Sequence, residues 1–98
     1  MRTVKVWSYE VEAYIEKESI GQVRYVGDSF EDITSDKIYD VLSIEEEMLR
    51  VVDDEEMDYL YSLINPAPLD MSSEGGTWKI IKDEKGILTQ KFKELKLL

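Results

Sequence analysis

Carboxylates supply most of the chemistry available to this sequence, because it contains no histidine and no cysteine. The densest group is Asp53–Asp58, which reads Asp-Asp-Glu-Glu-Met-Asp. Carboxylates are ligands of hard cations such as calcium. Read as an EF-hand loop, however, the run has Asp58 at the sixth position, where the sharp turn requires glycine. We therefore expect a solvated acidic turn, with no bound metal and no other cofactor.

Paired carboxylates also serve general acid–base catalysis, but with 22 acidic residues among 98 such pairs arise from composition alone. The missing histidine and cysteine exclude zinc sites built on imidazole or thiolate and every histidine-based triad. Residues 72–77 are rich in glycine, yet no lysine follows the second glycine, as a phosphate loop requires. A carboxylate-dependent or metal-dependent enzyme is thus the least favoured interpretation, and we expect no catalytic residues.

Tyrosine offers a second kind of chemistry, the recognition of another protein. Tyr59 and Tyr61 are two positions apart, so in a strand they share one face while Leu60 points to the other. If Leu60 faces the core, the tyrosine pair is exposed, and exposed aromatic side chains are frequent anchors at protein interfaces. Tyr25 and Phe30 would extend this patch through a long loop. The alternative is that all four rings pack in the interior.

The net charge of −10 is unevenly distributed along the chain. Residues 1–27 are balanced, residues 28–58 carry −11, residues 59–76 add −2, and residues 77–98 carry +3. A field this negative repels phosphate backbones, so we expect no direct binding of nucleic acid. It suits a basic protein partner, although high solubility alone would also account for it.

Three short strands joined by two tight acidic connections are predicted between residues 37 and 61. The predicted strands are rich in β-branched and aromatic residues, and the gaps between them have the length of hairpin loops. Two more strands follow from the same pattern before and after this stretch. The five predicted strands are 22–26, 37–44, 48–53, 58–61 and 77–82. A helix through Ile44–Val52 is the competing interpretation, because three glutamates and Met-Leu-Arg favour helix.

Residues 1–20 fit two interpretations. Val4, Trp7, Val11 and Tyr14 follow helical spacing, whereas the residues at 9, 11, 13 and 15 alternate as in a strand. The glutamates, lysine and alanine of this segment favour a helix, with Gly21 as its C-terminal stop. We expect the helix, and its apolar surface is sufficient for a homodimer contact.

The C-terminal residues 83–98 are expected to form a tail with either of two structures. Ile87–Thr89 could begin another strand, while Phe92 and Leu95 have the spacing of a short amphipathic helix. Ninety-eight residues is the size of one domain. We therefore expect a single domain with an extension over 1–20, a body over 22–82 and a tail over 83–98.

The order of the predicted elements indicates a mainly β protein with minor α content. A long loop after the first strand, tight turns between the middle three and a short turn before the last are the layout of a five-stranded SH3-like small barrel. An OB-like barrel has the same strand count, but no helix is evident between the third and fourth strands. The N-terminus has no signal-peptide core and no run of 18 apolar residues occurs, so we expect a cytoplasmic protein without a membrane segment.

Four short segments carry a resemblance to a known group of proteins. The segments are Tyr25–Phe30, Lys37–Leu42, Leu49–Asp54 and Asp58–Tyr61. They resemble small uncharacterised bacterial and prophage-type domains with the pattern GKxYxVL…RIVDDxGEDYLY, and the resemblance implies an SH3-like fold without known catalytic residues. It covers residues 23–65. Asp36 replaces the first glycine of the pattern, and the second is missing from Glu55-Glu56-Met57.

These observations favour a small, acidic, non-enzymatic module that binds another protein. The candidate binding residues are Tyr59, Tyr61, Tyr25 and Phe30, and the expected partner is basic. The alternative function is that of an acidic mimic of nucleic acid, or an inhibitor or immunity-type protein in phage or bacterial competition. The sequence lacks the Ala-Leu-Tyr-Asp-Tyr run of peptide-binding SH3 domains, so we do not expect polyproline binding.

Overall fold

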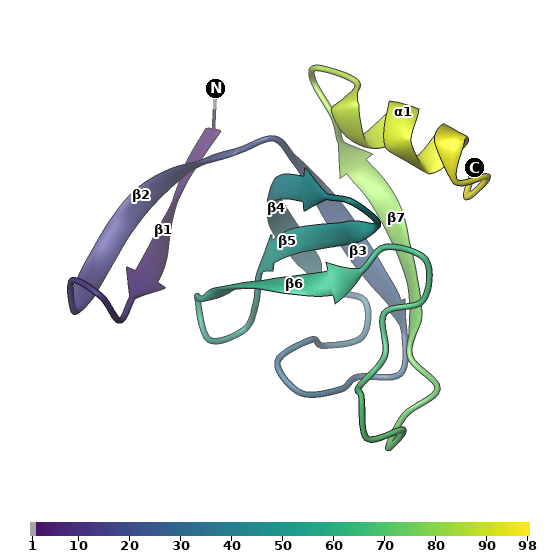
Figure 1. Ribbon diagram of the computed structural model, residues 1–98, viewed down its shortest axis with the longest axis horizontal. Coiled ribbons are helices and arrows are strands. Elements are labelled where there is room, and N and C mark those ends of the chain that lie inside the picture. The colour runs from purple at the N-terminus through teal and green to yellow at the C-terminus, as the bar shows by residue number, and fades with distance from the viewer. Residues whose placement is uncertain (1) are drawn as a thin grey trace.

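The computed structural model describes residues 2–98 and is mainly β, with seven strands and one helix (Figure 1). A two-stranded hairpin and a five-stranded antiparallel sheet make up the strands. The elements are β1 (Arg2–Ser8), β2 (Ala13–Ser19), β3 (Gly21–Gly27), β4 (Ile38–Glu45), β5 (Met48–Val52), β6 (Asp58–Ser62), β7 (Gly76–Lys82) and α1 (Ile87–Glu94).

The five predicted strands are all present as β3 to β7, and no predicted end differs from the observed end by more than one residue. They are arranged in the order β6-β5-β4-β3-β7. The competing helix through Ile44–Val52 is absent, because Glu45 to Met48 form a tight turn between two strands. Glu46 takes a positive φ of 58° in this turn, a conformation that a helix cannot include.

The expected closed barrel is not formed, since β6 and β7 remain the two edges of an open, curled sheet. The connection between them contains Pro66 and Pro68, which have no N–H and cannot extend a ladder. The connection is held by side-chain and backbone bonds instead. The Trp78 indole N–H donates to the Ser62 carbonyl at 3.0 Å, and the Gly76 N–H donates to the Pro66 carbonyl at 3.1 Å.

The predicted N-terminal helix is wrong, because this segment is a β-hairpin (Figure 1). Val6 pairs with Ile15 and Trp7 with Tyr14, so alternate residues of both strands lie on opposite faces. Val6 is buried, and Ile15 on the same face is partly buried. Apolar residues that serve two faces of a hairpin can imitate helical spacing over a segment this short, and the pairing of the strands decided the outcome.

Gly21 does not end a helix; it is the first residue of β3. A Cβ atom at this position would lie 2.5 Å from the Lys82 carbonyl oxygen and 2.7 Å from a methyl group of Leu88. Glycine is therefore required here by the close approach of β7 and α1. The preceding residue, Ile20, is already bonded to the sheet, since its N–H donates to the carbonyl of Val41 in β4 at 2.8 Å.

The C-terminal tail forms the helix α1, and the alternative strand at Ile87–Thr89 is absent. Asp83 fixes the start of the helix, because its carboxylate accepts hydrogen bonds from the Leu88 and Thr89 amides at 3.1 and 2.6 Å. These bonds, which outweigh the effect of burial, lower the pKa of Asp83. Leu88 and Phe92 then pack against the sheet and complete its core.

The core is built largely from aromatic side chains. Trp78 lies at its centre, with ring-centroid distances of 5.4 Å to Tyr25, 6.4 Å to Tyr39 and 6.4 Å to Tyr61. The other members of the buried cluster are Val23, Phe30, Ile33, Val41, Leu49, Val51, Leu63, Leu88 and Phe92. The loop between β3 and β4 contributes two of these, because Phe30 and Ile33 pair with each other and fold back into the core.

Candidate functional site

An exposed aromatic cluster lies on the N-terminal hairpin, formed by Trp7, Tyr9 and Tyr14. The Trp7 ring packs edge-to-face on both tyrosines, with centroid distances of 6.3 Å to Tyr9 and 5.2 Å to Tyr14. Tyr9 is 71% exposed and Tyr14 is 50% exposed. Trp7 and Tyr14 are a cross-strand pair, and they lie on the face opposite to the buried Val6. This hairpin aromatic cluster is therefore available to a partner.

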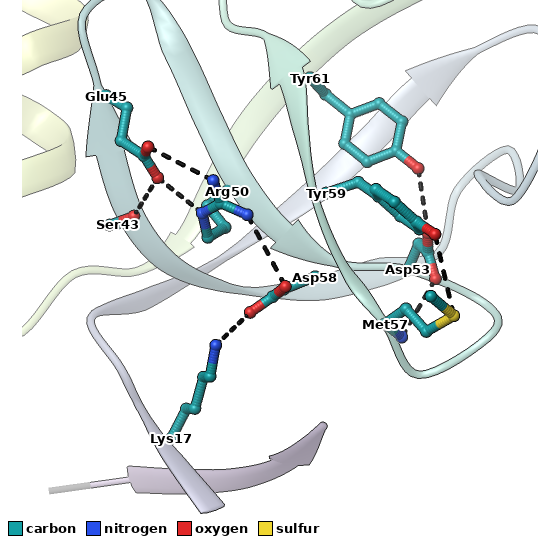
Figure 2. A network of polar contacts seen from close by, with 9 residues as sticks. All are labelled: Lys17, Ser43, Glu45, Arg50, Asp53, Met57, Asp58, Tyr59 and Tyr61. Atoms are coloured by element: carbon teal, nitrogen blue, oxygen red, sulfur yellow. Dashed lines mark hydrogen bonds and ion pairs between the residues drawn. The ribbon is translucent and has the colours of Figure 1, made fainter. Parts of the chain in front are cut away.

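Tyr59 of β6 extends the site from the sheet side and is 46% exposed. The hairpin is joined to the turn before β6 by the Trp7 N–H, which donates to the Glu56 carbonyl at 2.8 Å. Partial burial raises the pKa of Tyr59, and the charge of an ionised Tyr9 raises it further. The Tyr59 hydroxyl itself meets the Met57 sulfur at 3.9 Å (Figure 2).

Carboxylates surround these aromatic side chains. Glu10 and Glu12 are exposed in the hairpin loop, and the charges of Glu55 and Asp32 are near enough to raise the pKa of Tyr59. Aromatic faces attract lysine and arginine side chains, and carboxylates form charge-assisted hydrogen bonds with them. The chemistry that this site offers is thus the binding of cationic side chains.

The structure does not give the expected exposed patch of four aromatic side chains. Tyr25, Phe30 and Tyr61 are buried in the core, and only Tyr59 is exposed. Tyr59 and Tyr61 do share a face of β6, but that face is the inner one and Leu60 points outward. The reason is that the curled sheet covers Tyr61 but leaves Tyr59, near the start of β6, uncovered.

Tyr61 has a structural partner instead. Its hydroxyl donates to the Asp53 carboxylate at 3.1 Å (Figure 2), and Asp53 also accepts from the Glu55 amide at 3.0 Å. Burial raises the pKa of Asp53, against the opposing effect of these hydrogen bonds. Burial and the Asp53 charge both raise the pKa of Tyr61. Asp53 therefore holds the β5–β6 turn in shape.

Asp54, the next residue, anchors the long β3–β4 loop. Its carboxylate accepts hydrogen bonds from Thr34 at 2.7 Å, from Tyr39 at 2.9 Å and from the Lys37 ammonium group. Burial by itself would raise the pKa of Asp54, but these donors lower it. Among residues 2–98, no three carboxylates converge on a point that would hold a metal ion. The acidic turn is occupied with internal contacts.

A chain of ion pairs positions the hairpin against the sheet (Figure 2). Lys17 of β2 donates to Asp58 at 2.6 Å, and the other oxygen of Asp58 lies 3.7 Å from Arg50. Arg50 in turn binds Glu45 at 2.6 Å, which lowers the pKa of Glu45. At the other end of the hairpin, Arg2 donates to Asp40 at 2.8 Å. These contacts fix the place of the hairpin aromatic cluster beside Tyr59.

A hollow of about 330 Å³ lies where the hairpin meets the sheet, on the side of β7. Its walls include Glu18, Ser19 and Lys82, and an exposed ion pair at 3.5 Å joins Lys85 to Glu18 across it. Every buried side-chain polar atom in residues 2–98 has a hydrogen-bond partner. The hollow thus contains no unsatisfied group that would require a ligand.

The sequence predicts a homodimer contact for the apolar residues of this hairpin and does not place them beside Tyr59. Their alternation in the segment 9–15 was the available signal, and it was outweighed by helix-favouring composition.

Within the described part of the chain, no helix has the length and apolar character needed to cross a membrane. The comparisons give no match to a protein-family model, to a curated protein or to a solved structure.

Proposed function

We propose that this chain is a non-enzymatic interaction module that binds a basic segment of another protein through the hairpin aromatic cluster and Tyr59. The observation that carries the proposal is the exposure of these aromatic side chains within a group of carboxylates. Soluble proteins rarely leave neighbouring aromatic residues uncovered without an interaction to serve. Aromatic side chains are also the commonest energetic anchors of protein interfaces.

The charge of the chain supports a basic partner. Residues 28–58 carry a net charge of −11, and this segment includes the β5–β6 turn beside the aromatic site. Such a field accelerates the approach of a cationic surface and repels nucleic acid. A second copy of the same chain would carry the same charge, so hairpin-mediated homodimerisation is the less favoured occupant of this surface.

We also propose that the five-stranded sheet is SH3-like. Two features of the backbone favour this resemblance. Asp36 and Glu56 have φ values of 66° and 62°, and glycine is the residue that adopts this conformation without steric cost. These are the two positions at which the related pattern has glycine. Asp36 and Glu56 thus replace the two glycines and still have the positive φ that glycine adopts most readily.

Inhibition of a nucleic-acid enzyme by charge mimicry is the second candidate function. The −11 segment is the observation that favours it. Inhibition by mimicry depends on long-range charge and should weaken steeply as salt rises. An inhibitory effect that is insensitive to salt would reject mimicry, whereas loss of binding on removal of the aromatic side chains would favour the interaction module.

Affinity capture from lysates of the source cells, followed by titration of the purified partner, tests the proposed function. The test variant is Tyr9→Ala/Tyr59→Ala, and the control is Leu69→Ala/Met71→Ala in the exposed β6–β7 connection. We expect the test variant to bind about tenfold or more weakly, because exposed aromatic anchors contribute at least about 1–2 kcal/mol. The control should bind like the parent chain.

Two outcomes would overturn the proposal. One is capture of background proteins only, and the other is equal binding by the parent chain and the tyrosine variant. Light scattering on the isolated chain accompanies the titration, because it separates partner binding from self-association. A dimer that the tyrosine variant abolishes would assign the surface to a second copy instead.

A further inference from the structure

The outer edge of β2 is an unpaired strand edge. Two hydrogen bonds establish which backbone groups face it. The Trp7 N–H points away from β2, toward the Glu56 carbonyl, so the Trp7–Tyr14 pair is a non-hydrogen-bonded pair of the hairpin. The Ile20 N–H likewise points away from β1, toward the Val41 carbonyl. Because the pattern alternates, the N–H and C=O groups of Tyr14, Glu16 and Glu18 all face outward.

Within the described residues no strand is paired with β2 along this edge, and β4 approaches only its C-terminal end. β2 pairs only with β1, whereas the outer edge of β1 is covered at Trp7 by the β5–β6 turn. Figure 1 shows β2 on the outer side of the hairpin, away from β5 and β6. β4 occupies the same edge only from Ile20 onward, through the bond to Val41. Three outward N–H groups and three outward C=O groups can thus receive another strand.

The side chains along the edge select a basic strand. Glu16 and Glu18 lie with Tyr14 of the hairpin aromatic cluster on one exposed face of β2, and Glu12 lies in the turn just before the strand. Lys17 points to the opposite face and is neutralised by Asp58. Oppositely charged side chains on adjacent strands stabilise the pairing, and like charges destabilise it.

A second copy of the chain is a poor occupant of this edge. Antiparallel pairing of two β2 strands about their centre would place Glu16 directly opposite Glu16 of the copy. Tyr14 would then face Glu18, so no favourable charge pair would form on this face. The ion pair between Lys85 and Glu18 is exposed on both sides, and such pairs contribute little, so a partner's lysine can replace it.

We propose that β2 binds an extended segment of a partner protein, with lysine or arginine at alternate positions, as a third strand of the hairpin. The main-chain groups of Tyr14, Glu16 and Glu18 hold the segment, and their side chains select its charge. The inference rests on the proposed function in one respect: it specifies how the basic partner is held. It places the added strand next to the hairpin aromatic cluster, so both contacts serve one partner.

The probe for a binding test is a synthetic peptide of eight residues that alternate lysine and valine, acetylated and amidated at its ends. Its control has the same sequence and charge but a methyl group on every backbone nitrogen, which removes the donors that a ladder needs. Amide chemical shifts and hydrogen exchange of the full chain are recorded with each peptide. We expect slowed exchange at Tyr14, Glu16 and Glu18, and about tenfold or more weaker binding of the methylated peptide.

A pair of variants tests the protein side of the same contact. Glu16→Pro removes the outward N–H, and an edge strand tolerates proline where the N–H faces solvent. Glu16→Thr removes the same charge and keeps the N–H. We expect the proline variant to lose binding and the threonine variant to bind only a few-fold more weakly. If the proline variant proves unfolded, the comparison of the two peptides still decides the question.

Several results would overturn strand addition. Equal binding of both peptides would show that charge alone causes the binding. Protection at Leu60 would show that the peptide pairs with β6, an edge of the five-stranded sheet, and not with β2. The proposed function is tested separately, by the binding of Tyr9→Ala/Tyr59→Ala to the natural partner. It fails if this variant binds as tightly as the parent chain. If Tyr9→Ala/Tyr59→Ala loses the partner while Glu16→Pro keeps it, the interaction module stands and the strand addition is rejected.

Discussion

Asp54 shows how one carboxylate can hold a long loop in place. It receives hydrogen bonds from Thr34, Lys37 and Tyr39, and its own N–H donates to the Asp32 carbonyl at 2.9 Å. The loop therefore depends on an acidic side chain that the sequence presents only as part of a charged run. Burial raises the pKa of Tyr39 to about 12, so this phenol remains a donor throughout the physiological range.

We predict that Asp54→Asn lowers the free energy of unfolding at neutral pH by about 1–2 kcal/mol, because it weakens hydrogen bonds to a charged acceptor. The folded state lowers the Asp54 pKa below its ordinary 3.8. The stabilisation is therefore complete above the ordinary value and is lost as the pH falls through the depressed one. Urea denaturation from about pH 7 to about pH 2 measures the difference between the two proteins.

The control for this measurement is Glu74→Gln, which changes an exposed carboxylate in the β6–β7 connection. Its stability should follow the parent chain at every pH. A destabilisation by Asp54→Asn that is equally large at the acid end of the series would show that geometry, and not the charge of Asp54, stabilises the loop.

At the scale of elements, several turns and loops require a positive φ at residues other than glycine, which their amino-acid composition does not predict. Within residues 2–98, seven residues other than glycine have positive φ, and most lie in turns or loops rich in acidic residues. Glu56 is one of them, in the turn between β5 and β6. An L-residue in this conformation is strained by about 1–2 kcal/mol. The turn is therefore held by its contacts, including the bond from the Trp7 N–H to the Glu56 carbonyl.

We predict that Glu56→Gly raises the free energy of unfolding by about 1 kcal/mol, because glycine relieves the strain at a φ of 62°. Glu55→Gly is the matched control, since it removes the same charge at a neighbouring position without positive φ. It should lower stability by about 0.4–1 kcal/mol through the added freedom of the unfolded chain. Thermal melts of both variants give the comparison, and a stabilisation of equal size in both would point to relief of charge repulsion instead.

On the scale of the whole molecule, the hairpin and the sheet behave as parts of one structure. The hairpin contributes one fully buried apolar side chain, Val6, and is otherwise joined to the sheet by polar contacts at Trp7, Lys17 and Arg2. Exposed ion pairs of this kind contribute little individually. Val6 should therefore supply much of the energy that keeps the hairpin docked.

We predict that Val6→Ala lowers the free energy of unfolding by about 2 kcal/mol, the sum of lost burial and a small cavity. Amides of β1 and β2 should lose protection from hydrogen exchange first, before those of β3 to β5. Val11→Ala, at the exposed end of the hairpin, makes the same chemical change and should alter stability by less than about 0.5 kcal/mol. Equal effects of the two substitutions would mean that the hairpin is not docked through Val6.

The sequence by itself determined the mainly β class and the places of β3 to β7. Those strands have alternating β-branched and aromatic residues between acidic or proline-containing breaks, so local preference and long-range pairing agree. It also determined the acidic field, because formal charge depends on composition alone.

Only the tertiary structure decided the hairpin, the open sheet and the position of the candidate site. Residues 1–20 have helix-favouring glutamates, and strand pairing between Val6 and Ile15 overrides them through contacts that no local pattern encodes. Alternation placed Tyr59 and Tyr61 on one face but could not state which face is inside. The packing of Trp78 against Tyr61 made that face the core, and the docking of the hairpin on the β5–β6 turn brought its aromatic cluster beside Tyr59, the exposed member of the pair.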